Sequence, residues 1–185
     1  MSGRRLVVVL LLLVGLWSSA RMVVAGQRPT LGADTLGLGR PATESEIDAL
    51  DIDVMPDGTG LPPGEGGAAD GAPVWAQACR ACHGPNGEGG VAAPVVGRDP
   101  AGPPTVGNYW PYATTLYDYI ARAMPRMAPG TLTPDQVYGL VAWILAKNSI
   151  IDENAVMNAK TLPLVMMPAR DLFVPDDRRG GPETR

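Results

Sequence analysis

The stretch Cys79-Arg80-Ala81-Cys82-His83 holds both cysteines and the single histidine of the chain. Two thiols three positions apart, followed at once by an imidazole, form the attachment pattern of a c-type haem. In this pattern each cysteine sulfur adds to one vinyl group on the same edge of the porphyrin, and the histidine becomes the proximal ligand of the iron. The sequence therefore predicts one covalent haem c, held by Cys79, Cys82 and His83.

Three other uses of the cysteine pair are less consistent with the sequence. A redox dithiol is expected in a thioredoxin-like βαβ context, which this sequence does not show. A tetrahedral zinc site needs four ligands, and only carboxylates could complete it here. A structural disulfide would leave His83 unexplained. We therefore favour the haem site.

The first 25 residues have the pattern of an export signal, because a basic start and an apolar run precede small residues that offer a cleavage site after Ala25. The alternative is an uncleaved membrane anchor. Arg21 interrupts the apolar run short of the roughly 20 residues that span a bilayer. We expect cleavage and a periplasmic protein, which meets a membrane only if this segment is retained.

The charge of the chain is acidic, with 15 basic and 19 acidic residues and a formal net charge of −4. Cleavage after Ala25 would remove three arginines and no acid, so the mature chain is more acidic still. This surface disfavours nucleic acid and anionic membranes as partners, and it suits a positively charged protein.

Glycine and proline divide the chain into parts. Residues 26–71 are predicted to form an N-terminal arm, with a short helix that Thr43 and Glu46 cap and an irregular strap from Pro56 to Pro73. Residues 72–151 are predicted to form the haem domain, and residues 152–185 a C-terminal extension. The expected helices of these last two parts run from Pro73 to about Ala81, from Thr114 or Thr115 up to Pro125, which forces Met124 out of helical geometry, and from Thr133 to Lys147 with Pro134 and Gln136 in its first turn; a short turn from Asp152 to Ala159 follows. Apolar faces are predicted at Leu116, Tyr119, Ile120 and Ala123 of the second helix and at Val137, Leu140, Val141, Ile144 and Leu145 of the third.

The order of helix, CxxCH, loop, helix, methionine-proline loop and long helix resembles the class I cytochromes c, over about Ala72 to Ile151. The resemblance implies an all-α haem domain in which the first and last helices cross and the haem lies in an apolar crevice. The irregular N- and C-terminal extensions lie outside this fold. They are too rich in Pro and Gly to form a core of their own, so they wrap the haem domain or lie along a partner. The second use is our hypothesis.

The sixth iron ligand can be sought by elimination. With one histidine in the chain, bis-histidine ligation within it is excluded, and sulfur is the alternative. Met124 and Met127 lie between the last two predicted helices, where class I cytochromes supply their ligand, and Pro125 keeps Met124 extended. We predict Met124, with Met127 as the alternative; either could instead pack as an apolar side chain. A His/Met pair raises the reduction potential and leaves no open position, which favours electron transfer over catalysis at the haem.

Further contacts follow from the same resemblance. In class I cytochromes a proline carbonyl soon after the motif accepts a hydrogen bond from the proximal histidine, and Pro94 occupies the similar place. The alternative is a proline that only shapes a loop. The indole of Trp110 and the hydroxyls of Tyr109 and Tyr112 could bond the haem propionates or simply wall the crevice. Arg98 is a further propionate candidate, or a solvated surface arginine.

Stretches outside the haem motif resemble the cytochrome c subunits of periplasmic sulfite and sulfane-sulfur dehydrogenases, including the cytochrome half of the Sox sulfur-oxidising system. In that family a molybdopterin subunit oxidises the sulfur substrate and passes single electrons to the haem subunit. One departure is Arg126-Met127 after Pro125, where the family has aromatic and acidic residues. The stretches are Leu38–Thr43, Asp51–Val54, Asp57–Gly64, Thr105–Leu116, Met167–Asp171 and Phe173–Asp176.

The resemblance implies a monohaem electron-accepting subunit that is not catalytic alone. Its partners would be the molybdopterin subunit and a downstream electron acceptor. The alternative is a free-standing periplasmic shuttle to an oxidase or another dehydrogenase. An enzyme in its own right, such as a haem thiosulfate dehydrogenase or a peroxidase, usually needs a second haem or an open axial position, and one CxxCH with one histidine disfavours it.

Overall fold

The computed structural model describes residues 39–174. The predicted export signal and the ends of both extensions lie outside the described residues. The chain divides into two units, one up to Ala49 and one from Leu50 onward. Within residues 39–174, no helix combines the length and the hydropathy that a membrane span needs.

The first unit contains the short helix α2 (Glu44–Asp48), which the capping pattern predicted. The hydroxyl of Thr43 accepts a hydrogen bond from the Glu46 amide, and the Glu46 carboxylate accepts one from the Thr43 amide at 2.9 Å. The guanidinium of Arg40 donates to both oxygens of the same carboxylate, at 2.6 and 2.8 Å. These contacts lower the pKa of Glu46 to about 2, with the Arg40 contact as the largest cause.

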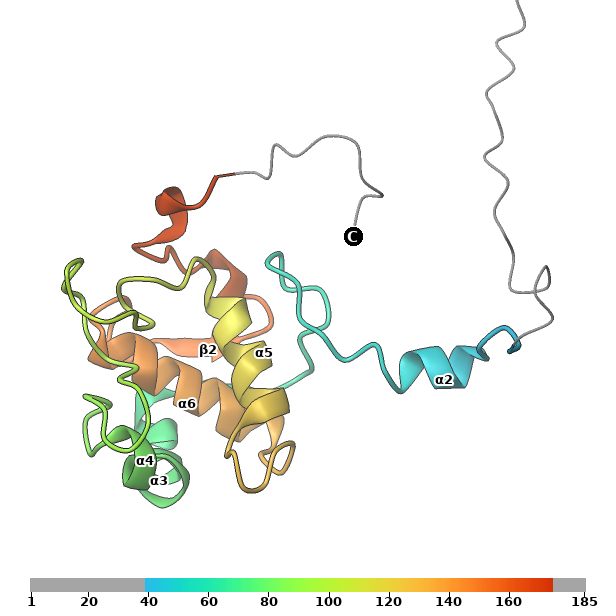
Figure 1. The fold of residues 1–185 in the computed structure, drawn as a ribbon, viewed down its shortest axis with the longest axis horizontal. Helices are drawn as coiled ribbons and strands as arrows, with labels where there is room; N and C mark the ends of the chain where they lie inside the picture. Colours follow the sequence, from blue (N-terminus) through green and yellow to red (C-terminus); the bar gives the residue numbers. More distant parts are fainter. Residues whose placement is uncertain (1–38, 175–185) are drawn as a thin grey trace, which may run out of the picture. The chain divides into compact units, whose positions relative to one another are not determined.

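The second unit is mostly helical, with irregular segments before and after the helices, as predicted (Figure 1). A two-stranded antiparallel sheet pairs Gly66 with Met157 and so joins the segment before α3 to the segment after α6. The elements in chain order are β1 (Glu65–Gly67), α3 (Ala68–Ala78), α4 (Arg80–His83), α5 (Ala113–Ala123), α6 (Pro134–Lys147), β2 (Val156–Asn158) and the 3-10 helices η2 (Leu162–Leu164) and η3 (Arg170–Leu172).

Helix α6 is the centre of the core, and its start is the one that the sequence predicted. The Thr133 hydroxyl caps the helix, Pro134 lies in its first turn, and the Gln136 side chain accepts a hydrogen bond from the Thr133 amide at 2.9 Å. These contacts satisfy amides that a helix start otherwise leaves free. The predicted apolar face is buried, with each side chain at most 3% exposed: Val137, Leu140, Val141, Ile144 and Leu145.

Helices α3 and α6 cross at a pair of glycines, which allows the two backbones to touch. A Cβ atom built on Gly71 would overlap the carbonyl of Gly139, and one built on Gly139 would lie 2.9 Å from the Gly71 nitrogen. The contact therefore depends on the absence of both side chains. It places the end of α3, and with it the CxxCH stretch, against the core.

The start of α3 differs from the prediction, because the helix begins at Ala68 and Pro73 lies inside it. The predicted strap also contains the strand β1. The Asp70 carboxylate accepts a hydrogen bond from the Gly67 amide at 2.9 Å and so caps the helix start. The small residues that suggested a loop are the ones that permit the close crossing with α6. Tertiary packing thus overrides the weak local helix propensity of this stretch.

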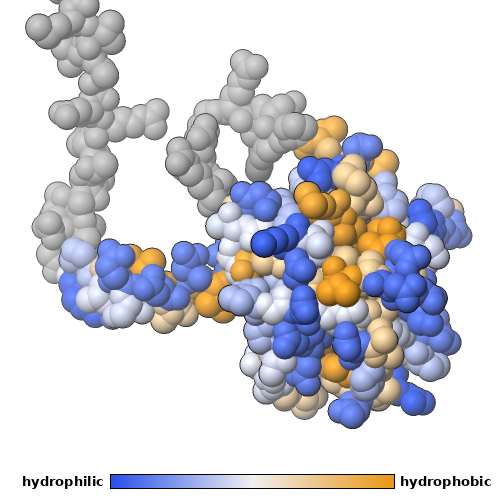
Figure 2. All heavy atoms as spheres, turned by 180° about the vertical axis from the view of Figure 1, so that it is seen from behind, coloured by the Kyte–Doolittle hydropathy of each residue, from blue (hydrophilic) through white to orange (hydrophobic). Residues whose placement is uncertain are grey.

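The described part of the C-terminal extension, residues 152–174, packs on the domain. The expected helical turn from Asp152 to Ala159 is wrong, since Val156–Asn158 form the strand β2 on β1. Leu162 is fully buried and Met167 is 3% exposed, and both belong to the central apolar cluster. For residues 152–174, wrapping the domain is therefore the use that the structure shows. Figure 2 shows apolar residues on the surface of the molecule. Leu164 and Met166 of this extension are 75% and 72% exposed.

Helix α5 begins at Ala113, after Tyr112, and not at a threonine cap. Its end is as predicted, because Met124 has extended backbone angles before Pro125. Leu116 and Ile120 of the expected face are buried, whereas Tyr119 is 48% exposed.

Two buried tyrosines predict how stability depends on alkaline pH. The Tyr138 hydroxyl donates to the Pro62 carbonyl at 2.9 Å, and burial raises the pKa of Tyr138 to about 12. Its ring centroid lies 4.5 Å from that of Tyr117, whose pKa burial also raises. An unfolded tyrosine titrates near pH 10, so the folded chain keeps these protons to higher pH than the unfolded chain. The stability they provide is complete below about pH 10 and is lost as the pH rises above it.

We expect Tyr138→Phe to lower the free energy of unfolding by about 1 kcal/mol at neutral pH, through the lost hydrogen bond. Between about pH 10 and 12 its stability should then fall less steeply than that of the wild type. Urea denaturation at a series of pH values measures both effects. The exposed Tyr109→Phe variant is the control and should follow the wild type. A wild-type curve that stays flat over this interval would contradict the assignment.

Candidate functional site

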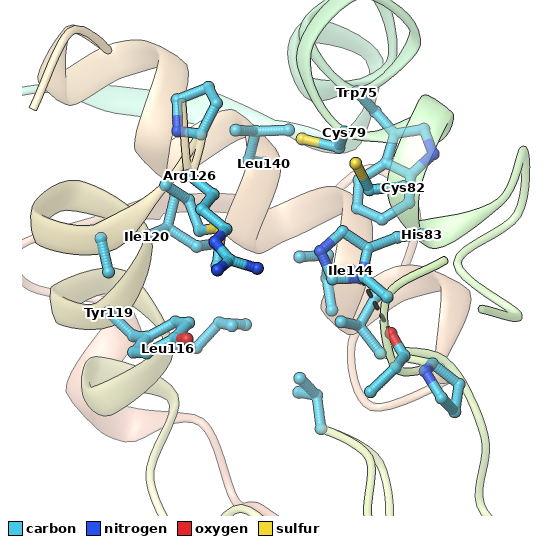
Figure 3. A pocket seen from close by; sticks show the side chains of 18 of the residues that line it. Trp75, Cys79, Cys82, His83, Leu116, Tyr119, Ile120, Arg126, Leu140 and Ile144 are labelled. Atoms are coloured by element: carbon cyan, nitrogen blue, oxygen red, sulfur yellow. Dashed lines mark hydrogen bonds between the residues drawn. The ribbon is translucent and has the colours of Figure 1, made fainter. Parts of the chain in front are cut away.

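A cavity of about 610 Å³ opens between α3 and α4 on one side and α5 with its following loop on the other. Figure 3 shows the thiols of Cys79 and Cys82 on one wall, with the His83 ring beside them and Leu116 and Tyr119 across from them. Its volume lies within the roughly 300–1,000 Å³ range of cofactor pockets. The lining is mainly apolar, so the cavity is suited to a large apolar group.

The end of α3 brings the three residues of the motif to this wall. Helix α3 ends at Ala78, and Cys79 caps it before the single turn of α4. The His83 amide donates to the Cys79 carbonyl at 3.0 Å, which keeps the motif in one turn. Cys79 is half-buried and Cys82 is exposed. Burial raises the pKa of Cys79 to about 11, and the neighbouring Cys82 adds to the shift, so the free Cys79 thiol is protonated at neutral pH.

His83 is oriented by a backbone carbonyl, and the acceptor corrects our prediction. The Nδ1 atom of His83 lies 2.8 Å from the Ala93 carbonyl oxygen, so Ala93 and not Pro94 supplies the carbonyl. The carbonyl groups of Ala93 and Pro94 are neighbours in one loop, so the prediction was wrong by one residue. Because a carbonyl oxygen can only accept, Nδ1 carries the proton and Nε2 keeps a free lone pair. This is the tautomer that a histidine needs to ligate a metal through Nε2.

Trp75 supports the turn that carries His83. Its indole nitrogen donates to the carbonyl of Gly84 at 3.2 Å, and its ring centroid lies 6.1 Å from that of His83. The Trp75 ring also stacks on that of Trp143 of α6, with ring centroids 4.2 Å apart. Trp75 is not among the site residues predicted from the sequence. Its place on α3, one turn before Cys79, is the signal that could have identified it.

The two methionine candidates differ in their surroundings. Met124 is half-buried, lines the cavity and packs against the central apolar cluster. Met127 is 93% exposed and is not among the cavity residues. The geometry therefore favours Met124 over Met127 as the partner of His83, and its role as a ligand stays a prediction.

Of the four residues predicted as partners of the haem propionates, one lines the cavity. Trp110 lines the cavity and packs edge-on against Tyr119, with ring centroids 5.7 Å apart. Tyr119 also lines the cavity, although the sequence analysis placed it only on an apolar face. The other candidates lie elsewhere: Tyr109 packs on Phe173, Tyr112 lies under Arg170, and Arg98 donates to the Ser149 carbonyl.

The residues present fit a haem c. Two thiols adjoin an imidazole in the required tautomer, a thioether lines the same apolar cavity, and this donor set matches His/Met iron ligation. Over residues 39–174, no group of three or more His, Cys, Asp or Glu side chains could hold a separate metal ion. The zinc alternative therefore finds no support in the described part of the chain.

Comparison with known proteins agrees with this geometry. Residues 66–144 match a family model described as cytochrome C oxidase, cbb3-type, subunit III. A chain in the crystal structure of the sulfane dehydrogenase SoxCD from Paracoccus pantotrophus is 40% identical, with a TM-score of 0.69. The match covers 77% of this chain and 73% of that chain. No curated protein matches the sequence.

Proposed function

The chain belongs to the class I c-type cytochromes, and on that premise we propose that it is the electron-accepting subunit of a molybdenum-containing sulfite or sulfane dehydrogenase. Cytochromes of this family contain haem c and carry electrons. The finer assignment is supported by the 40% identity to a chain of a sulfane dehydrogenase. That similarity covers 77% of the chain, so it reaches beyond the cytochrome match of residues 66–144 into the extensions.

The chain's own residues account for the parts of this role that a carrier needs. A haem c bound in the cavity supplies the one-electron chemistry. Cys79 and Cys82 would hold it through thioether bonds, and His83 and Met124 would ligate its iron. The hydrogen bond from His83 to the Ala93 carbonyl fixes the orientation and the tautomer of the imidazole ring. The apolar walls would keep water away from a bound haem, and with His83 and Met124 both serving as iron ligands no coordination position would remain for a substrate.

We place this activity in the periplasm, because haem attachment to CxxCH and the export pattern of residues 1–25 are consistent with each other. The donor is the sulfur-oxidising subunit, and a downstream acceptor takes the electron onward. The acidic net charge of −4 suits a positively charged face on either partner.

The test is affinity purification of the tagged mature protein from its native periplasm. The eluate is assayed for molybdenum, and for reduction of the haem after addition of sulfite or a sulfane-sulfur donor. We expect molybdenum to copurify and one of the donors to reduce the haem rapidly. The Met124→Ala variant separates the two readouts, because it should retain molybdenum while the haem is reduced slowly.

The second candidate is a free-standing shuttle, which the small haem unit alone would permit. A monodisperse protein without molybdenum that sulfur donors leave oxidised would favour the shuttle and overturn the subunit proposal.

A further inference from the structure

Arg126 is the one permanently charged side chain among the residues that line the cavity. The other lining residues are apolar, or are neutral groups such as Thr105, Trp110 and Tyr119. Figure 3 shows the Arg126 guanidinium reaching into the cavity from the loop after α5. A single cation therefore faces the space that the haem would fill.

No carboxylate of the described residues pairs with this guanidinium. Over residues 39–174 the ion pairs are Arg40 with Glu46 and Arg122 with Asp118. Arg122 lies on the last turn of α5, only four residues before Arg126, and its charge is met within the helix. The positive charge of Arg126 can thus interact with a charged group inside the cavity. A bound haem would bring two carboxylates and an iron whose charge changes on reduction.

We propose that Arg126 raises the reduction potential of the haem iron through its positive charge. The oxidised iron carries one positive charge more than the reduced iron, so a nearby cation disfavours oxidation. At an effective dielectric constant of about 20, a unit charge about 12 Å away changes the equilibrium constant for reduction about tenfold. The wall of a cavity of about 610 Å³ lies within that distance of its centre. Arg126 is exposed, and screening by solvent limits the change in reduction potential to about this size.

The inference rests on haem binding and does not require the dehydrogenase partner. The test is a potentiometric titration of the purified holoprotein, followed by its visible absorption. We expect Arg126→Gln to lower the potential by about 59 mV, which is a tenfold change for a one-electron couple. Arg126→Lys should stay near the wild-type value. Lys160→Gln removes the same charge from an exposed site outside the cavity lining and should leave the potential unchanged.

Salt provides a second readout, because exposed charges are screened over about 10 Å at 0.1 M ionic strength. The difference between wild type and Arg126→Gln should therefore shrink as salt rises. Equal potentials for wild type and Arg126→Gln, or equal shifts for Arg126→Gln and Lys160→Gln, would overturn the proposal. Loss of the methionine–iron absorption band in Arg126→Gln would also overturn it, since Arg126 would then act by holding the ligand loop.

Discussion

Replacing Met124 by alanine is expected to remove the methionine–iron absorption band of the oxidised protein and to lower its reduction potential by more than about 0.1 V. Different axial ligands give haem proteins reduction potentials that span about 0.8 V, and a thioether ligand favours the reduced iron. Met124 lines the cavity and would ligate the iron there, so its removal would leave one coordination position of the iron open. The open position should then bind carbon monoxide in the reduced protein. Absorption spectroscopy and potentiometric titration measure the three effects.

Met127→Ala is the matched control, because it removes the same side chain from the same loop. Met127 is 93% exposed and outside the cavity lining. The variant should therefore keep the absorption band and the reduction potential of the wild type, and its reduced form should not bind carbon monoxide. If Met127→Ala lost the band and Met124→Ala kept it, Met127 would be the ligand. The loop would then have to turn inward on haem binding.

Replacing Gly71 by alanine is expected to destabilise the domain by about 3 kcal/mol or more. Overpacking a core typically costs 1–3 kcal/mol, and here the added methyl group meets the backbone carbonyl of Gly139, which cannot rotate away. The gain of about 0.5–1 kcal/mol from alanine in a helix does not offset this. Since domains are stable by only about 5–15 kcal/mol, a larger residue at Gly71 should prevent folding.

Thermal and urea denaturation of the holoprotein measure this effect. The control is Ala76→Leu, which adds more volume to an exposed position of the same helix and should change stability little. Gly139→Ala should resemble Gly71→Ala, because its methyl group would enter the same contact from α6. A Gly71→Ala variant as stable as the wild type would show that the helices can move apart without penalty.

The sequence predicted those parts of the molecule in which local chemistry decides the structure. The CxxCH stretch names its cofactor, because the spacing of the thiols follows from the porphyrin edge. The starts of α2 and α6 were predicted from Thr43 and Thr133, since a capping box satisfies its own amides without help from the rest of the fold. Pro125 likewise marked the end of α5.

The missed features depend on contacts between distant parts of the chain. The stretch before Pro73 looks irregular by composition, and only the crossing with α6 explains why it is a helix. The acceptor for His83 was placed at Pro94 instead of Ala93 because a loop register of one residue cannot be read from sequence. Tyr119 looked like a core residue, because periodicity cannot distinguish a core face from a cavity wall.

The pairing of Gly66 with Met157 has a consequence for the order in which the chain folds. The strands β1 and β2 come before and after the helices α3 to α6 in the chain, so their contact has a long separation along the sequence. Bringing together two segments so far apart in the chain costs conformational entropy before their contact forms, and the folding rate falls as contact order rises. Helix α3 also packs mainly on α6, which comes later in the chain. We therefore expect the second unit to fold only when nearly its whole length is present.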